Sequence, residues 1–307
     1  MRKFIVGMLM ISFIFITGAC TQKSSKELRI GILPDVDSIP LIIAQEMGYF
    51  EEEKVRVILH HFKSPIDRDS ALQSHHIDGA ISDVLAVCFA KENGFDVTIT
   101  SMTNGSYKFL AAKDLAVCSI KELKGKDIGM SLNTIIEYTT DRILEEEGLS
   151  AKAINKVSIP NIPARLEMLQ HGKIDAATLP EPLASVAMAN GAKLISSSDM
   201  LGINPGVLLF REETITTKAD EIKAMYRAYN KAIAYLKDTP IEEYVEVLIT
   251  KGGLPESIEN NIVLPTYHDA AMPLEQDVSE VIAWLTEKGL IKKTYTYQTL
   301  VSDQFIE

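Results

Sequence analysis

Short polar turns follow five apolar runs of the sequence, and their side chains offer hydroxyl, amide and carboxylate groups to a small ligand. The candidate binding residues, in chain order, are Asp35, Ser38, Ser82, Asp83, Asn104, Ser106, Ser131, Asn133, Thr134 and Glu181. Free backbone N–H groups at a helix start suit the turn 131–134 to a carboxylate, sulfonate or phosphate. The alternative is ordinary helix capping, because Ser, Thr, Asn and Asp are the preferred cap residues.

Two of these candidates are acids that lie 98 residues apart, at positions 83 and 181, each directly after a strand-like run. Carboxylates in such positions can accept charge-assisted hydrogen bonds from an amine or amino group of a ligand. Their alternative role is compensation of a helix dipole, which stabilises a helix by about 0.3–1 kcal/mol. Because two carboxylates would repel a bare anion such as nitrate, Asp83 and Glu181 favour an organic ligand with an N–H donor.

The spacings of the histidine and cysteine residues along the chain match no familiar metal-binding or catalytic motif. His60 and His61 are adjacent in a strand-like run, so their side chains point to opposite faces and cannot readily share one ion. Cys88 lies in the apolar run DVLAVCFA, where a buried thiol is expected, although a disulfide with Cys118 stays open. We therefore expect no metal site, no cofactor and no enzyme active site.

Aromatic side chains could stack on a ring-shaped ligand. The candidates Tyr49, Phe50, Tyr107 and Tyr138 fit a hydrophobic core equally well. Trp284 lies in an amphipathic stretch near the C-terminus, where we expect it to pack.

The elements that position these turns are encoded twice. ALQSHHIDGAISD (71–83) and MLQHGKIDAATLP (168–180) are nearly the same phrase, and strand-like and helix-like runs flank both copies in the same order. The second copy includes a capping box, Thr134-x-x-Glu137. Strands that alternate with short helices form mainly parallel sheets covered by helices. The chain is therefore expected to build two similar α/β lobes.

The remaining segments suggest how the lobes are joined. The links 106–115 and 203–212 each contain a strand-like run, so a two-stranded hinge is expected. The rest of the chain shows helical spacing and forms a tail. We predict a first lobe of residues 28–110 and 206–307 and a second lobe of residues 111–205.

The N-terminus has the features of an export signal. A basic pair, Arg2-Lys3, precedes an apolar run (4–16), and small residues lead into Cys20. This order resembles a bacterial lipoprotein signal, with a signal peptide at 1–19, lipidation of Cys20 and a polar tether at 20–27. An ordinary signal peptide or an uncleaved anchor is the alternative. The expected location is the extracytoplasmic face of the cell membrane.

Composition narrows the class of partner. The chain has 307 residues, 46% hydrophobic and 24% charged, which is typical of a globular protein. Its net charge of -11 argues against nucleic acid as a partner, because an acidic surface repels phosphates. A monomer is expected.

Four stretches carry a family resemblance. They are PLIIAQEMGYFEEEKVRV (40–57), IDGAISD (77–83), ELKGKDIGMSLNT (122–134) and GKIDAATLPEPLASVAMANGAKLI (172–195). Together they resemble the solute-binding proteins of ABC importers for nitrate, sulfonate, taurine and thiamine-type pyrimidines. The resemblance covers about residues 28–240 and implies a type II periplasmic-binding-protein fold with the ligand in an interlobe cleft.

The same resemblance suggests a function. It implies delivery of a small polar organic molecule (a sulfonate, a taurine-like zwitterion or an aminopyrimidine) to an ABC permease and its ATPase. One alternative is an enzyme on the same fold, similar to a pyrimidine synthase with a cysteine-rich motif, although Cys88 and Cys118 lie far apart. The other alternative is a sensory or surface binding module.

Overall fold

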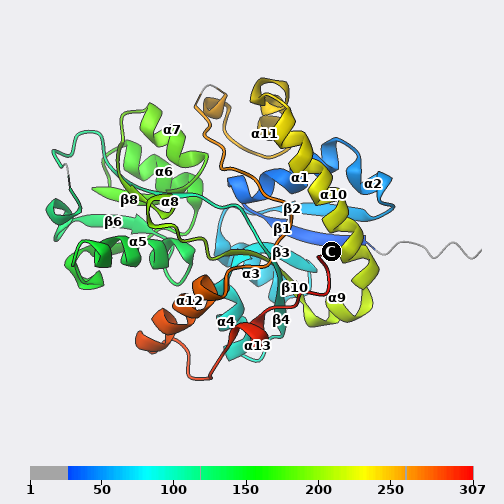
Figure 1. Ribbon diagram of the computed structural model, residues 1–307. Helices are drawn as coiled ribbons and strands as arrows, with labels where there is room; N and C mark the ends of the chain where they lie inside the picture. The colour runs from blue at the N-terminus through cyan, green and yellow to red at the C-terminus, as the bar shows by residue number, and fades with distance from the viewer. Residues whose placement is uncertain (1–26, 118, 260, 307) are drawn as a thin grey trace, which may run out of the picture.

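The computed structural model describes residues 27–306 except 118 and 260. It contains two α/β lobes side by side, the second of them green in Figure 1. Each lobe is built on a five-stranded sheet flanked by helices, as predicted. The predicted signal peptide, Cys20 and the tether up to residue 26 lie outside the described residues.

The first sheet has the strand order β2-β1-β3-β10-β4. Its strands are β1 (Glu27–Ile32), β2 (Arg56–His61), β3 (Gly79–Asp83), β4 (Val97–Met102) and β10 (Gly206–Arg211). Its helices are α1 (Ile39–Glu46), α2 (Tyr49–Glu52), α3 (Pro65–Gln73) and α4 (Val84–Glu92). β1 pairs in parallel with β2 and β3, whereas β10 is antiparallel to β3 and β4. The sheet is therefore mainly parallel with one reversed strand.

The second sheet repeats this arrangement in the order β7-β6-β8-β5-β9. Its strands are β5 (Tyr107–Ala111), β6 (Asp127–Met130), β7 (Asn155–Ser158), β8 (Ala176–Pro180) and β9 (Lys193–Ser197). Its helices are α5 (Ile135–Glu146), α6 (Ile162–Gln170), α7 (Leu183–Ala189) and α8 (Ser198–Leu201). β5 is antiparallel to β8 and β9, so it holds the place that β10 holds in the first sheet.

Two short segments, 103–106 and 202–205, carry the chain between the sheets. They lie side by side, because Thr103 N–H donates to Gly206 O at 3.0 Å and Asn204 Nδ2 donates to Thr103 O at 2.5 Å. The predicted boundary at residue 110 therefore falls inside β5. The two segments run side by side between the lobes, as expected of a two-stranded hinge, and the strand-like runs of the links form β5 and β10 in the two sheets.

The C-terminal tail is helical and packs mainly on the first lobe, as expected. It comprises α9 (Glu212–Thr217), α10 (Ala219–Asp238), α11 (Val245–Thr250), α12 (Glu275–Glu287) and α13 (Tyr297–Leu300). α10 packs on α1 and α2, and α12 packs on α4. Between α11 and α12, a 3-10 turn (Glu256–Ile258) contacts α7 of the second lobe. The tail therefore touches both lobes.

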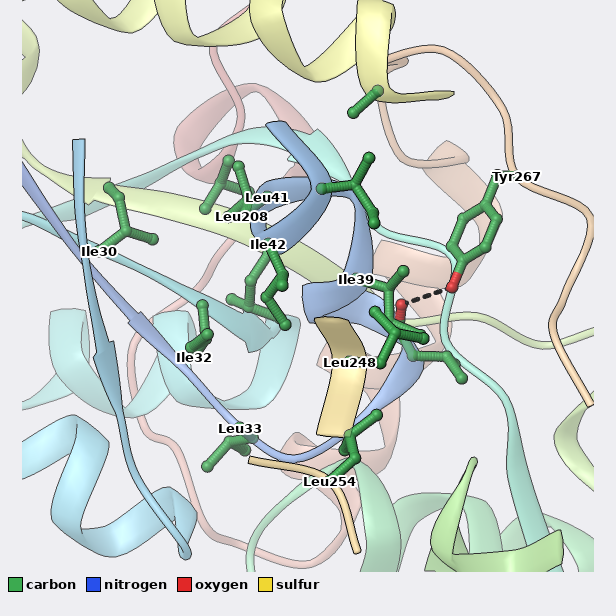
Figure 2. Packing of buried hydrophobic residues seen from close by; sticks show 14 of the residues in the cluster. Ile30, Ile32, Leu33, Ile39, Leu41, Ile42, Leu208, Leu248, Leu254 and Tyr267 are labelled. Carbon is green, nitrogen blue, oxygen red and sulfur yellow. Dashed lines mark hydrogen bonds between the residues drawn. The ribbon is translucent and has the colours of Figure 1, made fainter. Parts of the chain in front are cut away.

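The core beneath the tail fixes the turn that follows β1. Figure 2 shows Leu248 and Leu254 packed beside Ile39 and Leu33, around the start of α1. Tyr267 donates its hydroxyl to Val36 O at 2.9 Å, which holds the turn from the tail side. Among the described residues, no helix is both long and apolar enough to cross a bilayer.

Candidate functional site

A cavity of about 30 Å³ lies between the two lobes. Its polar wall residues are Asp35, Asp37, Arg68, Ser82 and Asp83 from the first lobe and Tyr107 and Arg165 from the second. Such a volume holds about two water molecules. As it stands, the cavity is too small for an organic molecule, so its walls must move for such a molecule to bind.

Three backbone N–H groups donate hydrogen bonds from one lobe to the other around this cavity. Val36 N–H donates to Glu181 O at 2.9 Å, and Ile162 N–H donates to Lys63 O at 3.0 Å. Ile135 N–H, at the start of α5, donates to the Asp83 carboxylate at 3.3 Å. Each contact joins a turn of one lobe to a helix start or strand end of the other, so opening the cleft must break all three.

The turn after β1 brings two buried acids to the cavity. Asp35 Oδ1 accepts hydrogen bonds from Ser38 N at 3.2 Å and Ser38 Oγ at 2.8 Å. Asp37 Oδ2 accepts one from the Tyr107 hydroxyl of the second lobe at 3.2 Å. Burial raises the pKa of Asp37 to about 6, and burial together with Asp37 raises the pKa of Asp35. These carboxyls favour a ligand that donates N–H groups or carries positive charge.

Asp83 ends β3 and caps α4 while it faces the cavity. Its Oδ1 accepts from Ala86 N at 2.8 Å, which is the N-cap role that the sequence also allowed. Burial raises the pKa of Asp83 above its ordinary value, and the positive charge of Arg68 opposes this shift only in part. Ser82 Oγ is buried on the same wall and has no hydrogen-bond partner among the described residues.

Two buried arginines complete the walls, and the sequence analysis did not identify them. Arg68 of α3 and Arg165 of α6 lie 97 residues apart, the same separation as Leu72 and Leu169 of the repeated phrase. Arg68 Nη1 donates to Ile81 O at 3.0 Å. A charged residue four positions before a core leucine in both copies was the signal available, because residues i and i+4 share a helix face.

Arg165 has more unpaired donor atoms than Arg68. Its side chain is fully buried, and Nη1 donates to Ile159 O at 2.9 Å. Nε and Nη2 have no hydrogen-bond partner within the described chain. Burial lowers the pKa of Arg165 to about 9, with no acidic neighbour to oppose the shift.

Other predicted residues lie near the crossing segments and away from the cavity wall. Ser38 caps the turn through Asp35, as above. Asn104 Nδ2 donates to the Tyr229 hydroxyl at 3.3 Å, and Asn104 Oδ1 accepts from His268 N at 3.3 Å. Ser106 Oγ donates to Asp199 at 2.8 Å. These contacts give the three residues structural partners.

The turn before α5 lies at a second cavity. Asn133 and Thr134 line it together with Asp83, and its volume is about 90 Å³. Thr134 caps α5 by accepting from Ile136 N at 3.2 Å. Ser131 Oγ is buried without a partner in the part of the chain that the structure describes.

The predicted capping box does not form at this turn, because Thr134 Oγ accepts from Ile136 N and not from Glu137 N. Glu137 accepts a hydrogen bond from Asn133 N at 2.7 Å instead of from the Thr134 N–H. Asn133 has a positive φ of 57°, which turns its N–H toward the Glu137 carboxylate.

Glu181 differs most from its expected position. Its side chain is 1% exposed, and Oε2 accepts from Ser185 N at 3.0 Å in the first turn of α7. Glu181 is not among the residues that line the interlobe cavity; its backbone oxygen accepts from Val36 N of the other lobe, and its Oε1 is buried without a hydrogen-bond partner among the described residues. Asp83 and Glu181 are related in sequence, but their carboxylates are not brought together on the wall.

The remaining chemistry-bearing residues behave as packing groups. Cys88 is a free, buried thiol whose pKa burial raises to about 12, whereas Cys118 lies outside the described residues. Trp284 is buried against Tyr138 with ring centroids 5.7 Å apart. Within the described chain, no three His, Cys, Asp or Glu side chains are arranged to hold a metal ion.

Comparison with known proteins relates this geometry to a family. A Bacillus subtilis protein assigned to aliphatic sulfonate binding is 24% identical over 290 residues, covering 89% of this chain and 85% of its own. The 4-amino-5-hydroxymethyl-2-methylpyrimidine phosphate synthase of Schizosaccharomyces pombe is 25% identical over 229 residues, 68% of this chain and 65% of its own.

Solved structures agree on the fold. The alkanesulfonate-binding protein SsuA of Xanthomonas axonopodis pv. citri, bound to MOPS, superposes with a TM-score of 0.77 at 20% identity, over 90% of this chain and 98% of its own. SsuA of Escherichia coli gives a TM-score of 0.73 at 18% identity, over 91% and 93%. The family model described as NMT1/THI5 like matches residues 35–243, and the chain belongs to that family.

Proposed function

We propose that this protein is an extracytoplasmic solute-binding protein that captures a small polar organic molecule and delivers it to an ABC importer. The observation that carries the proposal is the interlobe cavity, which is walled by buried charged groups from both lobes. Asp37 belongs to the first-lobe wall of this cavity, and Arg165 belongs to the second-lobe wall. Family membership and the transport-related names of several relatives support the same function.

Binding is coupled to movement of the lobes. The closed cavity of about 30 Å³ is smaller than an organic solute, and the chain crosses between the sheets only through two short segments, 103–106 and 202–205, apart from the contacts of the tail. Two-lobed proteins with such connections open and close as rigid bodies. The solute enters the open form, and closure removes it from water.

Anchoring and partners complete the proposal. Lipidation of Cys20 would hold the protein at the outer face of the membrane, with the polar stretch before residue 27 as a tether. The partners would be an ABC permease and its ATPase, and the binding protein would act as a monomer. A sensory role would use the same cleft but would not need the permease.

Catalysis is the alternative class, because the yeast relatives carry the name of a pyrimidine synthase. The cavity wall holds carboxyls, hydroxyls and guanidinium groups that bind solutes well. Cys88 lies in α4 on its buried face and has a raised pKa, which suits packing and not nucleophilic attack. We therefore propose binding without turnover.

Native mass spectrometry of the protein purified from its host tests this function. We expect a one-to-one complex with a small molecule that is recovered unchanged after release. Asp83→Asn, which weakens the contact with Ile135 N, should retain less of the molecule, whereas the exposed Glu246→Gln should retain as much as the wild type. Recovery of a chemically altered molecule would favour an enzyme, and a chain that carries and takes up no molecule would contradict the proposal.

A further inference from the structure

Building on the solute-binding function proposed above, we infer that Arg165 receives an oxyanion of the solute, a sulfonate or carboxylate, and that the amino end of the same solute faces the acids of the first lobe. The solute would thus be an amino-substituted organic oxyanion that bridges the two walls of the cavity. The inference depends on which edge of the Arg165 guanidinium is free.

The free edge is the one that binds carboxylates elsewhere in this protein. Arg29 contacts Asp78 through Nε at 3.2 Å and Nη2 at 3.0 Å, a bidentate pair. In Arg165 the same two atoms, Nε and Nη2, have no hydrogen-bond partner among the described residues. A group with two oxygens on one atom can satisfy both donors at once.

The internal repeat explains why this edge is free in only one lobe. Arg68, the counterpart of Arg165, donates from Nε to its sequence neighbour Asp69 at 2.8 Å, and its Nη2, which makes no hydrogen bond within the described chain, forms an ion pair with the same oxygen at 2.8 Å. The neighbour of Arg165 is Leu166, a buried apolar residue. The first-lobe arginine is therefore neutralised by its own helix, and the second-lobe arginine is left for a ligand.

The free edge of Arg165 is buried, so it is available to a bound ligand and does not act as a surface charge. Arg165 is fully buried on the cavity wall, and no acid of the described chain pairs with it. A buried charge without a partner is costly in a closed protein, and an anionic ligand removes that cost. Closure without the ligand should be less favourable for the same reason, so ligand charge and closure are linked.

The opposite wall determines the rest of the solute. Asp35, Asp37 and Asp83 all belong to the first lobe and face the cavity that Arg165 faces from the second. Three carboxyls would oppose a simple anion and favour a group that donates N–H bonds or carries positive charge. The polarity of the cleft, cationic on one side and acidic on the other, matches a compact zwitterion.

Calorimetric titration with four small probes tests this assignment. Taurine and β-alanine carry an amino group with a sulfonate or a carboxylate, ethanesulfonate lacks the amino group, and ethylamine lacks the oxyanion. We expect taurine or β-alanine to bind, and the stronger of the two identifies the oxyanion. Ethanesulfonate should bind at least tenfold more weakly, and ethylamine should show no binding.

Variants separate the free edge from general effects of charge. Arg165→Gln should weaken the tighter zwitterion about 10–100-fold, the range for loss of a charge-assisted hydrogen bond. Arg165→Lys keeps the charge without the bidentate edge. Its affinity for the zwitterion should lie between those of the wild type and Arg165→Gln. Arg142→Gln, an exposed arginine paired with Glu145, should leave binding unchanged.

The inference is overturned if no probe binds, if ethylamine binds as tightly as taurine, or if Arg165→Gln leaves the affinity unchanged. Its failure is distinct from failure of the proposed function. A host-purified protein that carries a solute without an oxyanion would refute the role of Arg165 while the solute-binding function stands. A protein that neither carries nor takes up any solute would refute both.

Discussion

Asp37 combines three features that make it a pH-sensitive group of the cavity. It is 2% exposed, it accepts a hydrogen bond from Tyr107 across the lobes, and burial raises its pKa to about 6. Between pH 3.8, the ordinary pKa of an aspartate, and about pH 6, Asp37 keeps its proton in the folded protein but has lost it in the unfolded chain. Stability must therefore fall as the pH rises through this window.

Replacing Asp37 with Asn should flatten this part of the stability profile. The ionised carboxylate costs the folded state at most about 3 kcal/mol above pH 6, and Asn removes that cost while it still accepts from Tyr107. We expect the melting temperature of the wild type to fall between pH 4.5 and about pH 7. The melting temperature of Asp37→Asn should fall less over the same range. Thermal scans at several pH values measure this, with the exposed Asp114→Asn as control. A variant as pH-sensitive as the wild type would show that Asp37 is already ionised at low pH.

Residue types alone located only part of the site. Asp35 follows β1, and Ser82 and Asp83 lie at the end of β3. A sheet places strand ends together, so these residues could be predicted. Arg68 and Arg165 could not be predicted as easily, because whether a helix arginine reaches beneath a strand depends on the packing around its stem. Glu181 was assigned to the wall by analogy with Asp83, but its carboxylate binds the first turn of its own helix.

At the scale of elements, a glycine in β1 and another in β6 each make room for an isoleucine that packs beside a buried arginine. A Cβ on Gly31 would lie 2.6 Å from Ile77 Cδ1 and 3.2 Å from Arg68 Cγ. A Cβ on Gly129 would overlap Ile174 Cδ1 and lie 3.5 Å from Arg165 Cγ. The repeat thus preserves a strand, helix and side-chain arrangement, and not only a sequence phrase.

Gly129→Ala should disturb this arrangement in the second lobe. The added methyl overlaps Ile174, so we expect a loss of about 1–3 kcal/mol in the free energy of unfolding, with weaker solute binding. Ile174→Val removes the overlapping Cδ1, so the double variant should recover much of the loss although Ile174→Val alone destabilises. Denaturant unfolding of the three variants measures this. An additive double variant would mean that the two side chains do not compete for space.

A second element-scale contact joins the tail to the second lobe. Lys288, at the end of α12, lies 2.6 Å from Asp141 and 3.0 Å from Glu137, both in α5. Its Nζ is also 4.1 Å from the centroid of the Trp284 ring. Because α12 packs on α4 of the first lobe, this ion pair holds the two lobes closed at a distance from the cavity.

Lys288→Gln should shift the protein toward open forms. The pair is partly exposed, so we expect a change of about 1 kcal/mol, which corresponds to about fivefold faster release of the solute. Stopped-flow dissociation and the radius of gyration from X-ray scattering report on this. The exposed Lys292→Gln removes the same charge nearby and should have no effect. Equal release rates for both variants would assign the Lys288 contacts to local packing alone.

At the scale of the whole molecule, alternation of strands and helices predicted both lobes and their repeated order. The crossings were less predictable, because β5 and β10 pair antiparallel with strands from distant parts of the sequence. A run of apolar residues shows that a strand forms but does not show which sheet accepts it. The boundary at residue 110 was misplaced for this reason, and the contacts of the tail with the second lobe were missed.

The central claim is that the two lobes close around one solute held between Arg165 and the first-lobe acids. A crystal structure of the host-purified protein with its solute tests it most directly. We predict density for one molecule in an enlarged interlobe cavity, with two of its oxygens facing Arg165 Nε and Nη2 and an N–H group facing Asp35 or Asp37. A solute bound outside this cavity, or one that leaves the Arg165 edge without a partner, would contradict the account.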